Sequence, residues 1–173
     1  ELVPRLVEAL AGKKVIGAAA DHWHTAVWTE AGELFTFGGG DDGMLGHGGN
    51  ENEHVPRLVE ALVGKKVIGA AAGSGHTAVW TEVGELFTFG CGACGQLGYG
   101  VDEDATVAVD EVNEVHVPRL VEALVGKKVI GAVAGNPHTA VWTEAGELFT
   151  FGHGFRGQLG HGMAVDEVNV PRL

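Results

Sequence analysis

Two cysteines, Cys91 and Cys94, have the C-x-x-C spacing that serves metal binding or redox chemistry. A structural zinc site takes four ligands, and the sequence has no second cysteine pair to complete one. A thioredoxin-type pair stands at a helix N-terminus, which the surrounding glycine-rich sequence does not predict. We therefore expect two ordinary loop cysteines and no cofactor. A zinc site completed by histidines or by a second chain is the alternative.

The other residues that could take part in catalysis are better explained by structural roles. His24, His76 and His138 recur in three similar segments, and a histidine repeated at a strand start is typical of a hydrogen-bonded packing residue. Ser74 is the only serine, so the sequence offers few side chains that could act as a catalytic nucleophile. The G-x-G-x-x-G spacing at Gly38–Gly43 precedes no predicted helix, which argues against a dinucleotide site. We expect no enzyme active site.

The elements that position these residues belong to an internal repeat. The string V-P-R-L begins at Val3, Val55, Val117 and Val170 of the 173-residue chain. We treat residues 1–173 as a single repeat domain. Its units are residues 3–54, 55–116 and 117–169, followed by the stub 170–173.

Each unit contains short segments with the pattern of β-strands. His24–Thr29 is rich in β-branched and aromatic residues, and Leu34–Phe37 follows it after a glycine-containing turn, which predicts a hairpin. Val15–Ala20 predicts a strand whose small side chains suit crowded backbones. Pro4–Leu10 fits an outer strand or a helix, and we favour the strand. Four short strands per unit predict an all-β chain of three propeller blades, each a four-stranded antiparallel sheet.

The order of motifs resembles the RCC1 repeat (regulator of chromosome condensation). The second unit carries it in Ala70–Val79, which contains A-G-S-G-H-T, in Glu85–Gly90, and in Gly95–Gly100, which reads G-Q-L-G-Y-G. The resemblance implies an RCC1-like β-propeller, and propellers of this family usually close with seven blades. Three blades leave two sheet edges unpaired, so we expect oligomerisation, or sequence missing from this chain, to complete the ring.

The columns that vary between units are concentrated in two stretches, residues 21–23 and 39–48 of the first unit and their copies. Loops of a propeller gather on its end faces, where aromatic, acidic and basic groups can form a binding surface. Neutral drift at solvent-facing loop tips is the alternative explanation. We predict a partner-binding surface that comprises Asp21, His22, Trp23, Asp41, Asp42, Met44, His47, Tyr99, His153, Phe155, Arg156 and His161.

The net charge of −12 comes from the same connecting segments. Acidic residues are concentrated in residues 50–54, 101–115 and 166–167. In the invariant segments the numbers of acidic and basic residues are equal. Acidic loops repel phosphate backbones and steer basic proteins, so we expect a basic protein partner and no nucleic acid; simple solubility is the alternative. No apolar run is long enough for a membrane span, and the few cysteines favour an intracellular protein.

These observations predict a protein–protein interaction module, a rigid propeller scaffold that displays variable acidic loops and forms homo-oligomers. The resemblance to RCC1 implies an alternative, a guanine-nucleotide exchange regulator of a small GTPase. The near-identity of the three units indicates another, an engineered or recently amplified repeat protein with no evolved partner.

Overall fold

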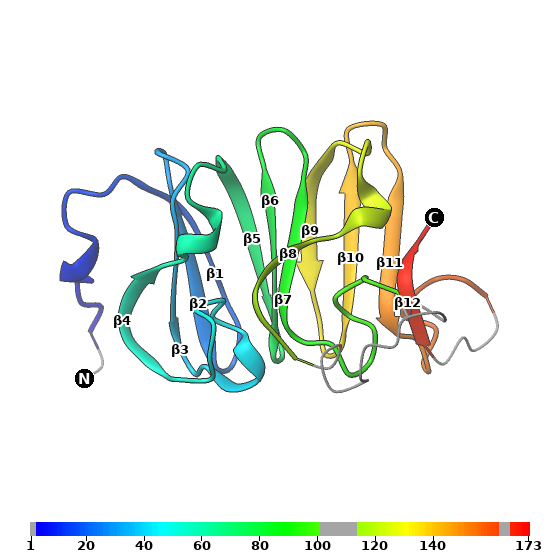
Figure 1. The fold of residues 1–173 in the computed structure, drawn as a ribbon, viewed down its shortest axis with the longest axis horizontal. Coiled ribbons are helices and arrows are strands. Elements are labelled where there is room, and N and C mark those ends of the chain that lie inside the picture. The colour runs from blue at the N-terminus through cyan, green and yellow to red at the C-terminus, as the bar shows by residue number, and fades with distance from the viewer. Residues whose placement is uncertain (1–2, 101–113, 163–166) are drawn as a thin grey trace.

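The computed structural model describes residues 3–100, 114–162 and 167–173. Within these ranges the chain forms three four-stranded antiparallel sheets side by side, with the two chain ends at opposite ends of the row (Figure 1). In each sheet the strands lie in chain order, which confirms the predicted all-β architecture. The sheets comprise β1 (Val15–Ala20), β2 (His24–Thr29), β3 (Leu34–Gly38) and β4 (Glu53–Leu58); β5 (Val67–Gly73), β6 (His76–Thr81), β7 (Leu86–Cys91) and β8 (Glu114–Leu120); and β9 (Val129–Ala134), β10 (His138–Thr143), β11 (Leu148–His153) and β12 (Glu167–Arg172).

Four 3-10 turns accompany the strands in the described parts of the chain. They are η1 (Glu8–Leu10), η2 (Asp41–Gly43), η3 (Glu60–Leu62) and η4 (Glu122–Leu124). None of the residues placed by the structure lies in a helix long and apolar enough to cross a membrane.

The V-P-R-L string forms the outer strand of the sheet that precedes it, because β4 pairs with β3 and β8 pairs with β7. The strand expected over Pro4–Leu10 is therefore wrong in part. In the later copies the strand ends at Leu58 and Leu120, and a 3-10 turn follows. In the first copy the described residues include no preceding sheet with which residues 3–10 could pair, and only the turn η1 forms there.

A close tryptophan–glycine contact explains the small residues of the inner strands. Trp80 on β6 is the register partner of Gly69 on β5, and a methyl group at Gly69 would overlap the indole ring. Gly17 and Trp28 make the same contact in the first sheet. A large side chain can lie across the inner strand only where that strand has no side chain of its own.

The hydrophobic core lies between neighbouring sheets. Ala26 and Leu34 of the first sheet pack in one buried cluster with Val67, Val79 and Phe89 of the second. A second cluster joins the second and third sheets in the same way. The second sheet thus packs one face against the first sheet and the other face against the third.

A buried histidine links the first sheet to the second. His24 Nε2 lies 2.7 Å from Thr77 Oγ1, and that hydroxyl donates to the Met44 carbonyl at 2.7 Å. Because the one hydroxyl proton of Thr77 is used there, the His24–Thr77 hydrogen bond needs a proton on His24 Nε2, while His24 Nδ1 lies 2.9 Å from Asp21 Oδ1. The loop carbonyl, the threonine and the histidine therefore form one chain of hydrogen bonds across the junction.

The same chain of hydrogen bonds joins the second sheet to the third. His76 Nε2 lies 2.9 Å from Thr139 Oγ1, which donates to the Gln96 carbonyl at 2.8 Å. The prediction that the recurring histidines are packing residues is confirmed for these two junctions. His138 has no following sheet among the residues described.

Acidification should weaken these junctions. Burial lowers the pKa of His76 to about 4 from its usual 6.5, so the folded state excludes a proton that the unfolded chain accepts. The stability that depends on the neutral ring is complete above pH 6.5 and is lost as the pH falls toward 4, by about 2–3 kcal/mol. Urea denaturation across this range measures the loss. His76→Gln should flatten this pH dependence, and an unchanged slope in that variant would contradict the assignment.

Candidate functional site

The connections between strands lie at two opposite ends of the sheets. Residues 21–23 join β1 to β2 and residues 39–52 join β3 to β4, so both connections lie at the same end, as do their copies in the other sheets. We call this end, at the bottom of Figure 1, the loop face. The opposite end carries the hairpin tips with η3 and η4, and we call it the hairpin face.

Loops from all three sheets line a single hollow of about 410 Å³ on the loop face. Within the hollow, Trp23, Gly75 and Pro137 occupy one column of the repeat, so each sheet presents a different side chain at the same place. A ligand in the hollow would contact all three repeats. The lining residues are Trp23, Asp41, Asp42, Met44, Ser74, Gly75, Cys91, Cys94, Gln96, Asn136 and Pro137.

Exposed aromatic side chains stand on the loop face. Trp23 is 58% exposed, and His22 meets it edge-on with ring centroids 4.6 Å apart. Phe155, on a loop of the third sheet, is 65% exposed and lies beside His153. Exposed aromatic groups next to a hollow are typical anchors of a protein interface.

Asp21 fixes the loop that carries Trp23. Its Oδ1 accepts the backbone N–H of Trp23 at 2.8 Å and that of His24 at 2.7 Å. Burial opposes ionisation, but these hydrogen bonds and the nearby His24 ring together lower the pKa of Asp21. Asp21 is therefore an ionised positioning residue beneath the surface that Trp23 presents.

Acidic groups from two sheets stand beside the hollow. Asp41 is exposed and Asp42 is half-buried in η2, while Glu114 begins β8 of the second sheet. Burial raises the pKa of Asp42, and the charges of Glu114 and Asp41 raise it further. A cation bound here would relieve this repulsion, so the local field favours a basic ligand. Several acidic residues of the predicted loops fall outside the described residues: Asp102, Glu103, Asp104, Asp110, Glu111 and Asp166.

Cys91 and Cys94 line the same hollow as free, half-buried thiols. Burial raises the pKa of Cys94, and the charge of Glu167 and the neighbouring Cys91 add to this shift, which disfavours the thiolate form. In the part of the chain that the structure places, no three His, Cys, Asp or Glu side chains are grouped so as to hold a metal ion.

Four of the predicted surface residues turn inward. Met44 is 3% exposed, and three residues of one column hydrogen-bond back to a threonine of their own sheet. They therefore hold the glycine-rich loop against the sheet, a role that variation between copies does not reveal. The three pairs are His47 with Thr36 at 2.9 Å, Tyr99 with Thr88 at 2.8 Å, and His161 with Thr150 at 2.9 Å.

The glycine-rich loop also clamps one sheet to the next. Gly46 has a φ of 76°, and a Cβ there would lie 2.8 Å from the Phe89 ring of the second sheet. Gly48 donates its N–H to the His116 carbonyl of β8 at 2.8 Å. Only glycine accepts both this conformation and this contact. The loop that the sequence analysis assigned to recognition is therefore partly structural, and the invariant Leu-Gly pair at 45–46 is the signal for it.

Besides the two cysteines, sequence reasoning left out five residues that line the hollow: Ser74, Gly75, Gln96, Asn136 and Pro137. Ser74 and Asn136 occupy the column of His22, and Pro137 occupies the column of Trp23. Variation between copies is the signal that finds them, because the same columns had already been singled out in the first unit.

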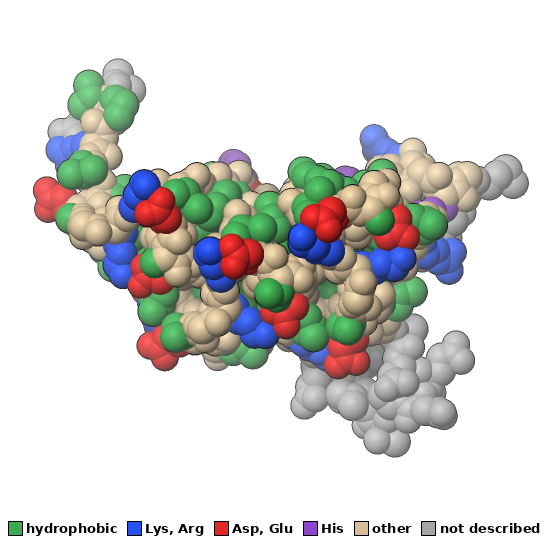
Figure 2. Space-filling model, turned by 90° about the horizontal axis from the view of Figure 1, so that it is seen from above, with side chains coloured by type: hydrophobic (Ala, Val, Ile, Leu, Met, Phe, Trp, Pro, Cys, Tyr) green, Lys and Arg blue, Asp and Glu red, His purple; other side chains and the backbone are tan. Residues whose placement is uncertain are grey.

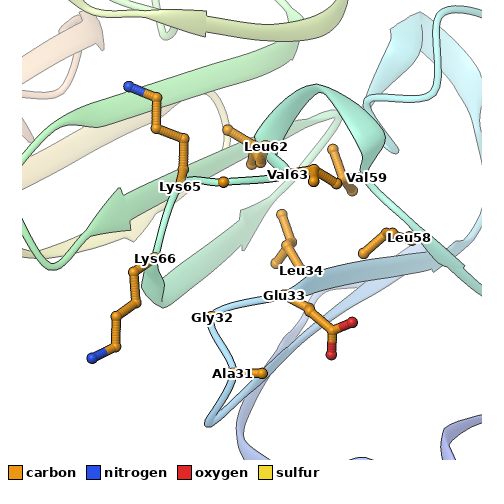
Figure 3. A pocket seen from close by; sticks show the side chains of 11 residues that line it. Ala31, Gly32, Glu33, Leu34, Leu58, Val59, Leu62, Val63, Lys65 and Lys66 are labelled. Carbon is orange, nitrogen blue, oxygen red and sulfur yellow. The ribbon is translucent and has the colours of Figure 1, made fainter.

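A second kind of hollow occurs on the hairpin face (Figure 3). It has about 260 Å³ between the first two sheets, and a hollow of about 220 Å³ with nearly the same residue types recurs between the next two. Because it repeats with the invariant framework, it is a product of sheet packing rather than a selective site. Its lining comprises Ala31, Gly32, Glu33, Leu34, Leu58, Val59, Leu62, Val63, Gly64, Lys65 and Lys66.

The hairpin face carries paired charges. Figure 2 views this face and shows lysine and glutamate side chains next to one another along it. Each pair is satisfied at short range, so this face offers little free charge to a partner. The pairs are Lys14–Glu30 at 2.6 Å, Lys66–Glu82 at 2.6 Å and Lys128–Glu144 at 2.7 Å.

Several known proteins are similar to this chain in sequence. The E3 ubiquitin-protein ligase HERC2 of Mus musculus is 36% identical over 175 residues, which cover 100% of this chain and 3% of that protein. RCC1 domain-containing protein 1 of Homo sapiens is 34% identical over 166 residues, which cover 80% of this chain and 44% of that protein. The chain spans less than half the length of these relatives, so the ligase activity in the first name is not carried over to it.

Solved structures show the same fold. Human WBSCR16 matches with a TM-score of 0.79 and 28% identity, over 93% of this chain and 38% of its own. Prp20p of Saccharomyces cerevisiae, the yeast RCC1, matches with a TM-score of 0.79 and 20% identity, over 91% of this chain and 37% of its own. The predicted RCC1-like blades are thereby confirmed. Because the model of the regulator of chromosome condensation (RCC1) repeat matches residues 31–80 and 83–142, well over half of the sequence, this chain belongs to the RCC1 repeat family.

Proposed function

We propose that this chain is a protein-binding module whose loop face takes a basic surface of a partner protein. The observation that carries the proposal is the hollow on that face, where the loops that differ between repeats come together. The strands and hairpins that carry these loops are nearly invariant between the repeats. The three repeats therefore combine into one asymmetric surface, although each is almost the same sequence.

Rigidity and charge support the same proposal. Asp21 fixes the loop of Trp23, and the glycine-rich loops are clamped to the next sheet, so little ordering is needed on binding. Asp41 and Asp42 supply negative charge beside the exposed indole. Among relatives, yeast Prp20p has been crystallised with Kap60 and studied for its binding to Gsp1p and histones, so a protein ligand suits this fold.

Replacing Trp23 should weaken binding of a basic protein strongly. With core histones as the probe, we expect Trp23→Ala to lose about 30-fold in affinity, the effect of an interface anchor worth about 2 kcal/mol. Asp41→Asn combined with Asp42→Asn should also weaken binding and reduce its dependence on salt. Isothermal titration at two salt concentrations measures both effects.

The hairpin face supplies a matched control. Glu30→Gln combined with Glu82→Gln removes the same charge from the opposite face and should leave the affinity unchanged. Equal weakening by both double variants would show that net charge alone attracts the histones and would contradict the proposal. Accelerated nucleotide release from a small GTPase, without histone binding, would replace this proposal with the exchange activity. Binding to neither probe would favour a repeat array without a partner.

A further inference from the structure

The first sheet has a face that is covered in the other two sheets. Val15 is 43% exposed, whereas Val67 and Val129 in the same column are 1% exposed. Val7 precedes this sheet and is also exposed, while its copy Val59 is buried. We call the face that contains Val7, Val15, Thr25 and Phe37 the leading face.

The third sheet has the opposite face open. Leu148 is 55% exposed, whereas Leu34 and Leu86 are 1% exposed because the next repeat covers them. The Leu34 carbonyl also accepts the backbone N–H of Val59, and Leu86 has the equivalent partner at the next junction. We call the face that contains His138, Leu148 and Gly160 the trailing face.

The polar groups of the two open faces complement each other. His138 occupies the column of the histidines that donate to Thr77 and Thr139 at the internal junctions. Thr25 occupies the column of those threonines and is only half-buried. Among the residues that the structure describes, His138 Nδ1 is buried without a hydrogen-bond partner, and neither His138 Nε2 nor the Thr25 hydroxyl makes a hydrogen bond. One face offers the donor and the other offers the acceptor.

The contact between a glycine-rich loop and the phenylalanine of the next sheet is also left incomplete at the two ends of the row. Gly46 of the first loop lies against Phe89 of the second sheet, and the contact recurs at the next junction. A Cβ at Gly160 of the third loop would meet nothing within 4 Å. Phe37, the copy of Phe89, lines an open hollow of about 660 Å³ together with Pro56. The loop that contains Gly160 and the open surface at Phe37 therefore correspond to the two sides of one internal junction.

We propose that the trailing face of one copy of this chain docks on the leading face of a second copy, head to tail. The interface continues the junction that the chain already makes twice, with His138 of one copy donating to Thr25 of the next. Leu148 is then covered by Val7 and Val15 of the second copy, and both open apolar faces are buried. The two surfaces differ, so the contact is heterologous and generates a ring or an open array.

Complementation of two blocked variants tests this docking. Sedimentation of the purified chain should give multiples of its 17.9 kDa mass. Leu148→Glu blocks the trailing face and Val15→Glu blocks the leading face, at positions whose exposure tolerates the change. Each variant alone should sediment as a monomer. An equimolar mixture should form a two-chain particle, because each variant keeps the face that the other needs.

Several outcomes would overturn the proposal. The parent chain could remain at 17.9 kDa at millimolar concentration, or either variant could still associate alone, or the mixture could stay monomeric. Association that survives one substitution would show that two copies use the same face. Val7→Glu blocks the leading face from outside the sheet and must behave as Val15→Glu does, which separates loss of docking from loss of folding.

Discussion

Leu86→Ala is expected to destabilise the chain by about 4 kcal/mol. Leu86 is 1% exposed and belongs to the cluster that joins the second and third sheets. Truncating a buried leucine removes its transfer free energy and leaves a cavity that rigid strands cannot fill. Urea denaturation followed by tryptophan fluorescence measures the loss.

The repeat supplies an unusually close control for this prediction. Leu148 occupies the same column of the repeat and the same strand position as Leu86, with the same residue types around it in its sheet. It is nevertheless 55% exposed. Leu148→Ala should cost less than about 1 kcal/mol when the measurement is made at a dilution at which copies of the chain do not associate. Equal losses in the two variants would mean that the junction between sheets does not supply the stability.

Gly69→Ala is expected to cost about 3 kcal/mol, the upper end of what overpacking typically costs. The added methyl group would overlap the indole of Trp80, which lies between β5 and the cluster that joins the second and third sheets. Trp80 is half-buried and packs against that cluster, so a shift of its ring would disturb this packing. Denaturation in urea gives the change in the free energy of unfolding.

Gly49→Ala makes the same chemical change where nothing lies within 4 Å of the new carbon. It should alter the stability by no more than about 0.5 kcal/mol. A loss at Gly69 no larger than the loss at Gly49 would contradict the tryptophan–glycine contact.

Local pattern predicted the centre of each sheet. The strands at His24–Thr29 and Val15–Ala20 form as expected, because alternation and small residues act within one hairpin. The outer strand could not be assigned to a sheet from sequence, since β4 pairs with a strand of the preceding unit. Its end at Leu58 also depends on the packing of η3 against the next sheet.

The candidate site was predicted only in part. The exposed residues Trp23 and Asp41 lie on the loop face, as variation between copies indicated. Met44 and His47 vary equally but turn inward, since Met44 is 3% exposed and His47 hydrogen-bonds to Thr36 of its own sheet. Variation alone therefore cannot separate a recognition residue from a repacked one.

Shared junctions give a physical reason for the near-identity of the framework. Each sheet must fit the sheet before it and the sheet after it, so a change on one face requires a matching change on its neighbour. Thr77 illustrates this constraint, because it accepts from His24 and donates to the Met44 carbonyl. Columns of the loop face that lie away from the junctions do not have to match a neighbouring sheet. Most of the differences between the units occur in these loops.

Amide hydrogen exchange at three equivalent valines tests most directly whether each sheet is closed by its neighbour. The N–H of Val67 donates to the Gly32 carbonyl and that of Val129 to the Gly84 carbonyl, both across a junction at 3.1 Å. Val15 has no preceding sheet within the described residues. In dilute solution Val67 and Val129 should exchange slowly and Val15 rapidly. Equal protection of all three amides in the monomer would contradict the account.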